Sequence, residues 1–218
     1  MADFNLYVVR HGQTYFNIFN KLQGWSNSPL TQKGIDGAKQ TADKLSDIPF
    51  KAVYCSDTTR AQDTAQIIID QNLNQNLQKP IVKYFFREHF YGYYEGLDSE
   101  QTWFQAGAPH GEPSFKEIIQ SHDMDTAKNY LKEADPFHMA ENAEEYWNRL
   151  NQGLNLIINN SDLKDGDNVL LISHGNTLLS LVEKYSNGEF DLTKRPNNGS
   201  VTKLEFKHNQ FKVISYNQ

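Results

Sequence analysis

The stretch "FNLYVVRHG" (residues 4–12) runs from a mostly apolar segment directly into an arginine, a histidine and a glycine. A short apolar run of this length is typical of a buried strand. Arg10 and His11 have no obvious role in the turn that follows, so they need another explanation. "NVLLISHG" (residues 168–175) repeats the arrangement, with His174 directly after a second apolar run. The two stretches together predict a sheet whose strands deliver polar side chains to one edge.

Further elements lie on either side of these two strands. Apolar runs at 51–56 and 81–86 favour two more buried strands. Apolar residues at helical spacing predict helices over 31–45, from about 59, over 141–158 and after "SHGN", with Thr31 as an N-cap. Strands that alternate with helices predict an α/β fold, a three-layer αβα sandwich around a mostly parallel central sheet.

The C-terminal segment and the middle of the chain depart from this alternation. "SVTKLEFKHNQFKVISYN" (residues 200–217) predicts a hairpin that turns at 207–210, and therefore an antiparallel edge of the sheet. Residues 97–140 are rich in Trp, Phe, His, Gly and Pro and predict a cap-like insertion over one edge. We expect a single domain over residues 1–218.

Composition limits the classes of function. The chain has 218 residues and a formal net charge of -6, which gives no overall attraction to nucleic acid or to an anionic membrane. A single cysteine, Cys55, excludes an internal disulfide framework. No apolar run approaches the roughly 18 residues of a membrane span, and the N-terminus lacks a signal-like segment. We expect a cytoplasmic protein; the sequence leaves its oligomeric state open.

Polar residues of an unusual kind follow each predicted strand. In an open α/β sheet, ligands bind beyond the carboxyl ends of the strands. We therefore expect one rim to collect two arginines, two histidines and one carboxylate, namely Arg10, His11, Arg60, Glu88 and His174.

Such a set suits a dianion, and phosphate fits it best. Arginine binds phosphoryl oxygens with two parallel hydrogen bonds and stays charged at any working pH. A neutral His11 could attack phosphorus, and a protonated Glu88 could supply the proton to the leaving alkoxide. Arg10, Arg60 and a protonated His174 would then balance the charge on the transferred group.

The motifs "VVRHGQTYFN", "LQGWSNSPLTQKG", "SDTTRAQDTA", "REHFYGYYEG" and "ISHGNT" resemble, in order and spacing, those of the histidine phosphatase superfamily, also called the phosphoglycerate mutase-like family. The resemblance covers about residues 4–97 and 141–182. It implies that His11 is phosphorylated, that Glu88 donates the proton, and that Arg10, Arg60 and His174 complete the phosphate pocket. It also implies that the site needs no metal and no cofactor. Supporting substrate contacts are expected from Asn17, Gln23, Gly24 and Asn176, and Tyr91 is near enough to Glu88 to join them.

Each residue also has a purely structural interpretation. Arg10 and His11 could cap a strand edge, Arg60 could be a surface arginine, and His174 could be a core histidine at a turn. Glu88 has other possible partners in its neighbours Arg87 and His89, and Glu95 could act as the acid in its place. Gln23, Gly24 and Trp25 could form only a loop anchored by the tryptophan.

Four hypotheses about function follow from these residues. The first is a phosphatase that works through phosphohistidine on a small phosphorylated metabolite. The second is a cofactor-dependent phosphoglycerate mutase, and the third is a binder of phosphorylated ligands without catalysis. The fourth makes His11, His174 and Glu88 a metal site.

The insertion favours the phosphatase. The resemblance implies that the mutases hold the charged phosphoglycerate with a lysine and a pair of adjacent arginines in this insertion. Residues 97–140 contain only Lys116, Lys128 and Lys132, no arginine, and more acidic than basic residues. "HGN" at 174–176 and "GW" at 24–25 lean toward the mutases, but we give the missing arginines more weight. The sequence therefore predicts hydrolysis of monoesters with an uncharged or weakly charged leaving group.

Overall fold

A computed structural model describes every residue of the chain except 74–76 and 78. Its described residues form one six-stranded sheet in the order β3-β2-β4-β1-β5-β6. The strands are β1 (Phe4–Arg10), β2 (Phe50–Cys55), β3 (Ile81–Val82), β4 (Asp167–Ser173), β5 (Val201–Lys207) and β6 (Gln210–Ser215). The first four are mutually parallel, whereas β5 and β6 run antiparallel at one edge. The predicted mostly parallel sheet with an antiparallel C-terminal edge is confirmed.

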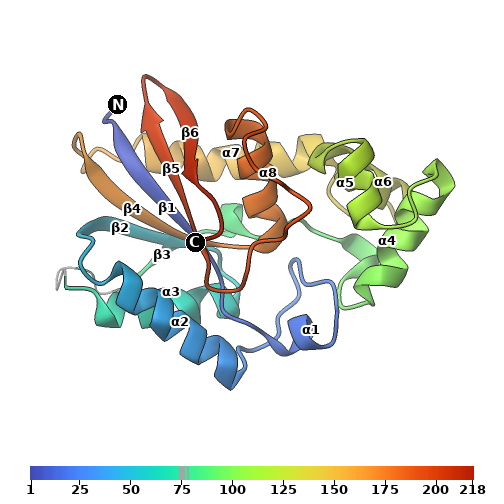
Figure 1. The fold of residues 1–218 in the computed structure, drawn as a ribbon, viewed down its shortest axis with the longest axis horizontal. Coiled ribbons are helices and arrows are strands. Elements are labelled where there is room, and N and C mark those ends of the chain that lie inside the picture. Colours follow the sequence, from blue (N-terminus) through green and yellow to red (C-terminus); the bar gives the residue numbers. More distant parts are fainter. Residues whose placement is uncertain (74–76, 78) are drawn as a thin grey trace.

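Helices cover both faces of the sheet (Figure 1). One face carries α2 (Gln32–Leu45) and α3 (Thr59–Gln71), and the other carries α7 (Ala143–Ile158) and α8 (Gly175–Tyr185). Because successive strand residues point to opposite faces, Val9 packs toward α2 and α3 while Val8 packs toward α7 and α8. Burial on both faces explains why these strands are apolar throughout.

The predicted helix starts agree with the structure to within two residues: α7 begins at Ala143, and α8 begins at Gly175, inside the "SHGN" motif. Thr31 caps α2, its side chain accepting a hydrogen bond from the backbone N–H of Gly34. Asn142 and Glu145 form a reciprocal capping box at the start of α7. The C-terminal hairpin turns at His208 and Asn209, which both have positive φ, as a tight two-residue turn requires.

The strand predicted over 81–86 is wrong beyond its first two residues. Only Ile81–Val82 pair with β2, and the chain then forms the 3₁₀ turn η1 (Tyr84–Phe86). β3 is an edge strand, so no further strand among the described residues forms hydrogen bonds to its outer side that would make it longer. The turn places Phe86 in the core, where its ring packs against Gly153 of α7. The contact is so close that a Cβ on residue 153 would lie 2.7 Å from the Phe86 ring. An apolar run alone does not distinguish these two outcomes.

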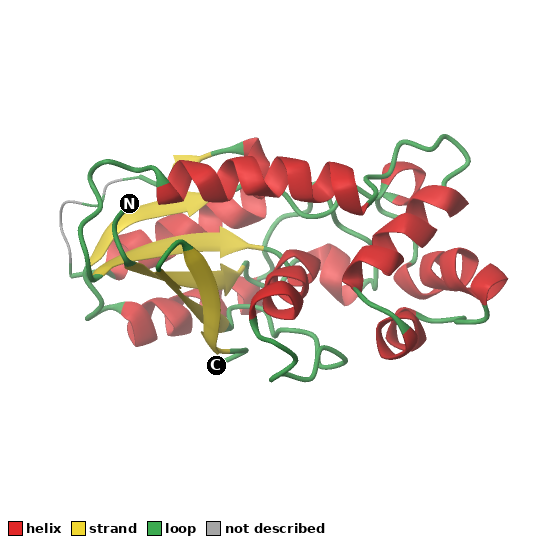
Figure 2. Ribbon diagram, turned by 90° about the horizontal axis from the view of Figure 1, so that it is seen from above, coloured by secondary structure: helices red, strands yellow, loops and turns green. Residues whose placement is uncertain are grey.

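Residues 97–140 form a group of helices beyond the carboxyl ends of the parallel strands (Figure 2). These are α4 (Ser99–Gly107), the 3₁₀ turn η3 (Ala108–His110), α5 (Phe115–Ser121) and α6 (Met124–Ala134). Lys128 of α6 donates from Nζ to Ser180 Oγ of α8, 3.0 Å away, and this contact ties the group to the sandwich. We refer to these helices as the cap.

Two short elements complete the site region: α1 (Tyr15–Ile18), which follows β1, and the 3₁₀ turn η2 (Gly92–Tyr94), which follows Tyr91. No helix within the described part of the chain is long and apolar enough to cross a membrane.

Candidate active site

The two histidines that follow strands lie beside each other. β1 and β4 are neighbours in register, with Arg10 opposite Ser173, so His11 and His174 leave the sheet at the same level. Their ring centres are 5.3 Å apart. The backbone N–H of His11 donates to Ser173 O at 3.0 Å and continues the ladder by one residue. The sheet therefore positions both rings through its register.

His11 is fixed as one tautomer. Its Nδ1 lies 2.7 Å from Gly12 O, and a carbonyl can only accept, so Nδ1 carries the hydrogen. The other ring nitrogen, Nε2, keeps its lone pair and has no hydrogen-bond partner among the described residues. Burial, followed by the charges of Arg60 and Arg10, holds the pKa of His11 well below its usual value. The ring is neutral near pH 7, the form that a nucleophile requires.

Gly12 is needed for this arrangement. A Cβ at Gly12 would lie 2.5 Å from Gly34 O in α2, which is closer than real Cβ contacts. The chain after His11 passes directly against this helix, and only glycine fits there.

Arg60 reaches the site from the first turn of α3, with its side chain fully buried. Its guanidinium donates to Ser26 O at 2.9 Å and to Gly24 O at 2.7 Å, and so holds the 23–26 loop. Arg10 donates to Pro196 O at 2.6 Å. Burial lowers the pKa of each arginine to about 10, which leaves both charged near neutrality.

Both arginines have an unused donor. The Nε atoms of Arg10 and Arg60 are buried and have no hydrogen-bond partner within the described part of the chain. A buried donor without an acceptor costs free energy unless a ligand supplies the acceptor. Two such donors near His11 favour an anion with several acceptor oxygens.

His174 is neutral here, unlike the protonated form expected from the sequence. Arg60 Nη2 donates to His174 Nδ1 at 3.2 Å, so Nδ1 must be an acceptor. Nε2 lies 2.9 Å from Ser56 Oγ and therefore carries the hydrogen. Burial, then the charges of Arg60 and His11, lower the pKa of His174 well below its usual value. The ring orients Arg60 instead of adding a second positive charge.

Glu88 is buried, with 4% of its surface exposed, and its carboxyl group contacts the N-terminus of α8. Its carboxyl oxygens accept from Asn176 N at 2.7 Å, Thr177 N at 3.0 Å and Thr177 Oγ1 at 2.9 Å. His89 N donates to it as well, at 3.0 Å. Glu88 also lines the same cavity as His11. The carboxyl group is thereby held in a fixed position at the site.

The neighbours that rivalled Glu88 are engaged elsewhere. Glu95 accepts from the backbone N–H groups of Gly24, Trp25 and Ser26 at 2.7–3.1 Å, which makes it the anchor of their loop. Arg87 forms two hydrogen bonds of 2.6 Å with Asp57. His89 Nε2 lies 2.6 Å from Glu141 O. Glu88 is therefore the carboxylate of this segment that faces His11's cavity.

The inner cavity has a volume of about 290 Å³ and brings together most of the residues predicted to contact substrate. Arg10, His11, Asn17, Gln23, Glu88 and Tyr91 line it. Asn176 supports the wall, because its side-chain amide donates to the Tyr91 hydroxyl at 2.8 Å. Gly24 does not line the cavity: its N–H is directed to Glu95, and its missing Cβ lets the loop approach His89 O.

Sequence reasoning missed several polar residues of the inner cavity: Lys21, Ser99, Arg195 and Asn198. Arg195 Nη2 donates to Asn176 Oδ1, and Asn198 Nδ2 donates to His11 O at 3.0 Å. The pairing of β5 with β1 explains their position, because an antiparallel β5 begins where its neighbour β1 ends. The "KRPNNGS" segment (194–200) before β5 therefore has to lie beside His11.

The proposed metal site does not fit this geometry. His174 has both nitrogens engaged with protein groups, and both Glu88 oxygens accept from N–H donors. No group of three or more His, Cys, Asp or Glu side chains suited to a metal ion occurs in the described part of the chain.

Solved structures of similar fold include a phosphoglycerate mutase and, below 25% identity, proteins named as phosphatases. The phosphoglycerate mutase from Bacillus anthracis str. Sterne superposes with a TM-score of 0.91 at 29% identity, covering 100% of this chain and 94% of that one. Bacillus stearothermophilus YhfR gives a TM-score of 0.70 at 25% identity, over 97% and 95% of the two chains.

Sequence relatives show the same mixture. The 2,3-bisphosphoglycerate-dependent phosphoglycerate mutase 2 of Gloeobacter violaceus is 28% identical over 187 residues, 81% of this chain and 73% of that protein. The uncharacterized phosphatase PhoE of Bacillus subtilis is 27% identical over 212 residues, 96% of this chain and 92% of that protein. The profile of the histidine phosphatase superfamily (branch 1) matches residues 6–112 and 107–218. The chain therefore belongs to the histidine phosphatase superfamily.

Proposed function

We propose that this protein hydrolyses phosphomonoesters through a covalent phosphohistidine at His11. The observation that carries the proposal is the state of the His11 ring. Gly12 O fixes the hydrogen on Nδ1 and leaves Nε2 with its lone pair. The charges of Arg60 and Arg10 act on this ring, and the Nε–H groups of both arginines have no acceptor among the described residues. A phosphoryl group at this position would have a nucleophile on one side and hydrogen-bond donors around its oxygens.

The first half-reaction transfers the phosphoryl group to the enzyme. His11 Nε2 forms a bond to phosphorus while the bond from phosphorus to the ester oxygen breaks. The leaving alkoxide takes a proton from the Glu88 carboxyl group. Arg10 and Arg60 bind the non-bridging oxygens and balance their charge.

The second half-reaction returns the enzyme to its starting state. Glu88, now a carboxylate, takes a proton from a water molecule as that water attacks phosphorus. The bond between phosphorus and Nε2 breaks, His11 regains its neutral form, and inorganic phosphate leaves. No step of this sequence needs a metal, so the proposal includes activity in the presence of a chelator.

The cations around the inner cavity bear on the choice between phosphatase and mutase. Of the three lysines in the cap, Lys128 is buried on Ser180 and Asp125, and Lys132 is paired with Glu145. Lys116 lines a second cavity and not the inner one. Arg195 and Lys21 add charge that the sequence argument did not count.

Because Arg195 and Lys21 add positive charge to the inner cavity, a mutase is a second candidate, and the mutase relatives also support it. The phosphatase remains our proposal, because the cavity beyond Arg195 contains five large apolar side chains and the charges of Lys116 and Glu100 there cancel, which gives a charged phosphoglycerate little to bind. We expect release of phosphate from p-nitrophenyl phosphate and from alkyl phosphates, unchanged by a chelator. We expect negligible interconversion of 2- and 3-phosphoglycerate primed with 2,3-bisphosphoglycerate. Interconversion faster than phosphate release would establish the mutase instead.

A further inference from the structure

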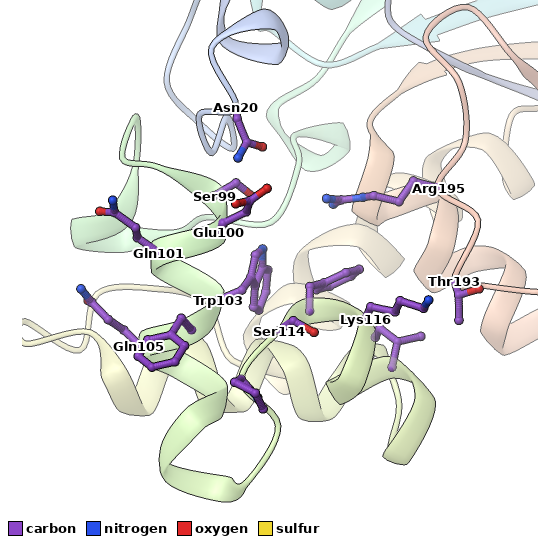
Figure 3. A pocket seen from close by; sticks show the side chains of 14 residues that line it. Asn20, Ser99, Glu100, Gln101, Trp103, Gln105, Ser114, Lys116, Thr193 and Arg195 are labelled. Carbon is purple, nitrogen blue, oxygen red and sulfur yellow. The ribbon is translucent and has the colours of Figure 1, made fainter.

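A second, larger cavity adjoins the site. It has a volume of about 880 Å³ and lies between α4, α5 and the 193–195 segment (Figure 3). Asn20, Ser99 and Arg195 line both this outer cavity and the inner one. A ligand that starts at His11 can therefore continue past these three residues into the outer cavity.

The two cavities differ in chemistry. The inner one presents mainly charged and amide groups, whereas the outer one combines polar residues, Glu100 and Lys116 among them, with five large apolar side chains. These are Trp103, Phe104, Pro113, Phe115 and Ile119. Phe104 is 57% exposed although it is aromatic. Lys116 stands beside Thr193, away from Trp103, whereas Glu100 lies on the Trp103 side (Figure 3).

Arg195 marks the border between the two cavities. Its guanidinium donates to Asn176 Oδ1 at the inner side and lies 4.7 Å from the centre of the Phe115 ring of the cap. This cation–π contact holds the guanidinium against the cap, so the charge of Arg195 stays at the border between the two cavities. Figure 3 shows the Arg195 side chain reaching across from the 193–195 segment toward the side where Asn20 and Ser99 lie.

We infer that the outer cavity binds the alcohol part of the substrate, and that this part carries an uncharged apolar group of at least the size of a phenyl ring. The inference rests on the proposed phosphomonoester hydrolysis and adds the class of leaving group. A volume of about 880 Å³ lies within the range of sites that enclose small organic molecules, roughly 300–1,000 Å³. A phosphate held by Arg10 and Arg60 would point its ester oxygen toward the shared residues, with the aromatic wall beyond them.

The test compares two phosphonates, which bind but cannot be hydrolysed. Ethylphosphonate fills the inner cavity alone, and 2-phenylethylphosphonate adds one ring that reaches the outer cavity. Burial of the ring predicts about tenfold tighter binding of the phenyl compound by calorimetry. Equal affinities would overturn the inference.

Two variants show where the ring binds. Phe104→Ser removes an exposed wall residue and should abolish most of the tenfold gain, with ethylphosphonate binding unchanged. Phe137→Ser is the matched control, since Phe137 is 66% exposed and lines neither cavity. A gain that survives Phe104→Ser would place the ring elsewhere and contradict the inference.

The corresponding esters separate this inference from the proposed function. Ethyl and 2-phenylethyl phosphate have leaving alcohols of similar acidity, so a difference in kcat/KM reports binding of the ring. If the two esters have equal kcat/KM and the two phosphonates bind equally, the proposed hydrolase activity stands and the apolar subsite is contradicted. If the phenyl phosphonate binds more tightly but neither ester is hydrolysed, the apolar subsite stands and the proposed hydrolase activity is contradicted.

Discussion

Glu88 and Glu95 lie in one short segment and both accept backbone hydrogen bonds, yet only one of them lines the cavity of His11. Each follows a 3₁₀ turn: η1 ends at Phe86, two residues before Glu88, and η2 ends at Tyr94, directly before Glu95. Glu88 is turned toward the start of α8, and Glu95 toward the 24–26 loop. The direction of each side chain therefore separates a carboxylate that lines the cavity of His11 from one that anchors a loop.

The proton-donor role of Glu88 predicts a dependence on the leaving group. Glu88→Gln removes the proton source and keeps the size of the side chain. Hydrolysis of an alkyl phosphate should slow by about 10²-fold or more, because an alkoxide needs a proton as it leaves. p-Nitrophenyl phosphate should slow far less, because nitrophenolate leaves without one. Steady-state kcat/KM for both esters measures this, and equal slowing of the two would remove Glu88 from the role.

The sequence could place the histidines of the site but not all of its charges. His11 and His174 follow regular strands, so strand register fixes their positions, and the pattern predicts both. The protonated state expected for His174 was wrong because it depends on Arg60 Nη2 meeting Nδ1, a contact between α3 and the start of α8. Tautomers of this kind follow from tertiary contacts that no local pattern contains.

At the scale of elements, the 23–26 loop is held from two sides. Arg60 donates to its carbonyl groups from α3, and Glu95 accepts its N–H groups from η2. This loop connects the region after α1 to the phosphate site and fixes the guanidinium of Arg60. The backbone polar groups of a buried loop need such partners, because water does not reach them.

Removing the anchor should therefore weaken both stability and phosphate binding. Glu95→Ala leaves the N–H groups of Gly24, Trp25 and Ser26 without their acceptor, at a cost of about 1–3 kcal/mol in the free energy of unfolding. We also expect weaker competitive inhibition by inorganic phosphate, because Arg60 loses its fixed support. Glu133→Ala is the control, since the Glu133 side chain is 69% exposed. Urea denaturation and phosphate inhibition constants that match the control would contradict this role.

The segment before β5 shows why part of the site escaped prediction. Arg195 and Asn198 lie in a polar connection that resembles a surface loop by composition. Their place becomes clear only from the pairing of β5 with β1, because Val201 lies opposite Val9 at the carboxyl end of β1. The sequence predicted the hairpin, but not which strand it joins. The helices of the cap were also missed, because aromatic and Gly-Pro content conceals their short apolar stripes.

At the scale of the whole molecule, three buried histidines are held neutral. Burial lowers the pKa of His89 to about 3, and it lowers those of His11 and His174 well below their usual value. In the unfolded chain each would take up a proton below about pH 6.5. The unfolded state then binds more protons than the folded state, so the fold loses stability as the pH falls below about 6.5.

This predicts a steep dependence of stability on pH. Each of these histidines should lower the free energy of unfolding by about 0.7 kcal/mol per pH unit at pH 6.5, where the unfolded imidazole is half protonated, and by about 1.4 kcal/mol per pH unit near pH 5. His89→Asn should reduce the slope by about one proton, whatever its effect on absolute stability, because it removes one of the three buried rings that stay neutral in the fold. Urea denaturation at pH 7.5, 6.0 and 5.0 measures the slope. A free energy of unfolding that stays constant over this range would show that the buried rings titrate normally.

The whole arrangement converges on one atom, Nε2 of His11, and a direct measurement tests it. The protein is mixed with p-nitrophenyl phosphate, quenched in alkali to preserve phosphohistidine, and digested for mass spectrometry. The account predicts a phosphoryl group on His11 alone. It also predicts that His11→Ala loses turnover by several orders of magnitude, whereas His208→Asn at the exposed hairpin turn keeps it. A phosphoryl group mapped to His174 or another residue, or near-normal turnover in His11→Ala, would contradict the account.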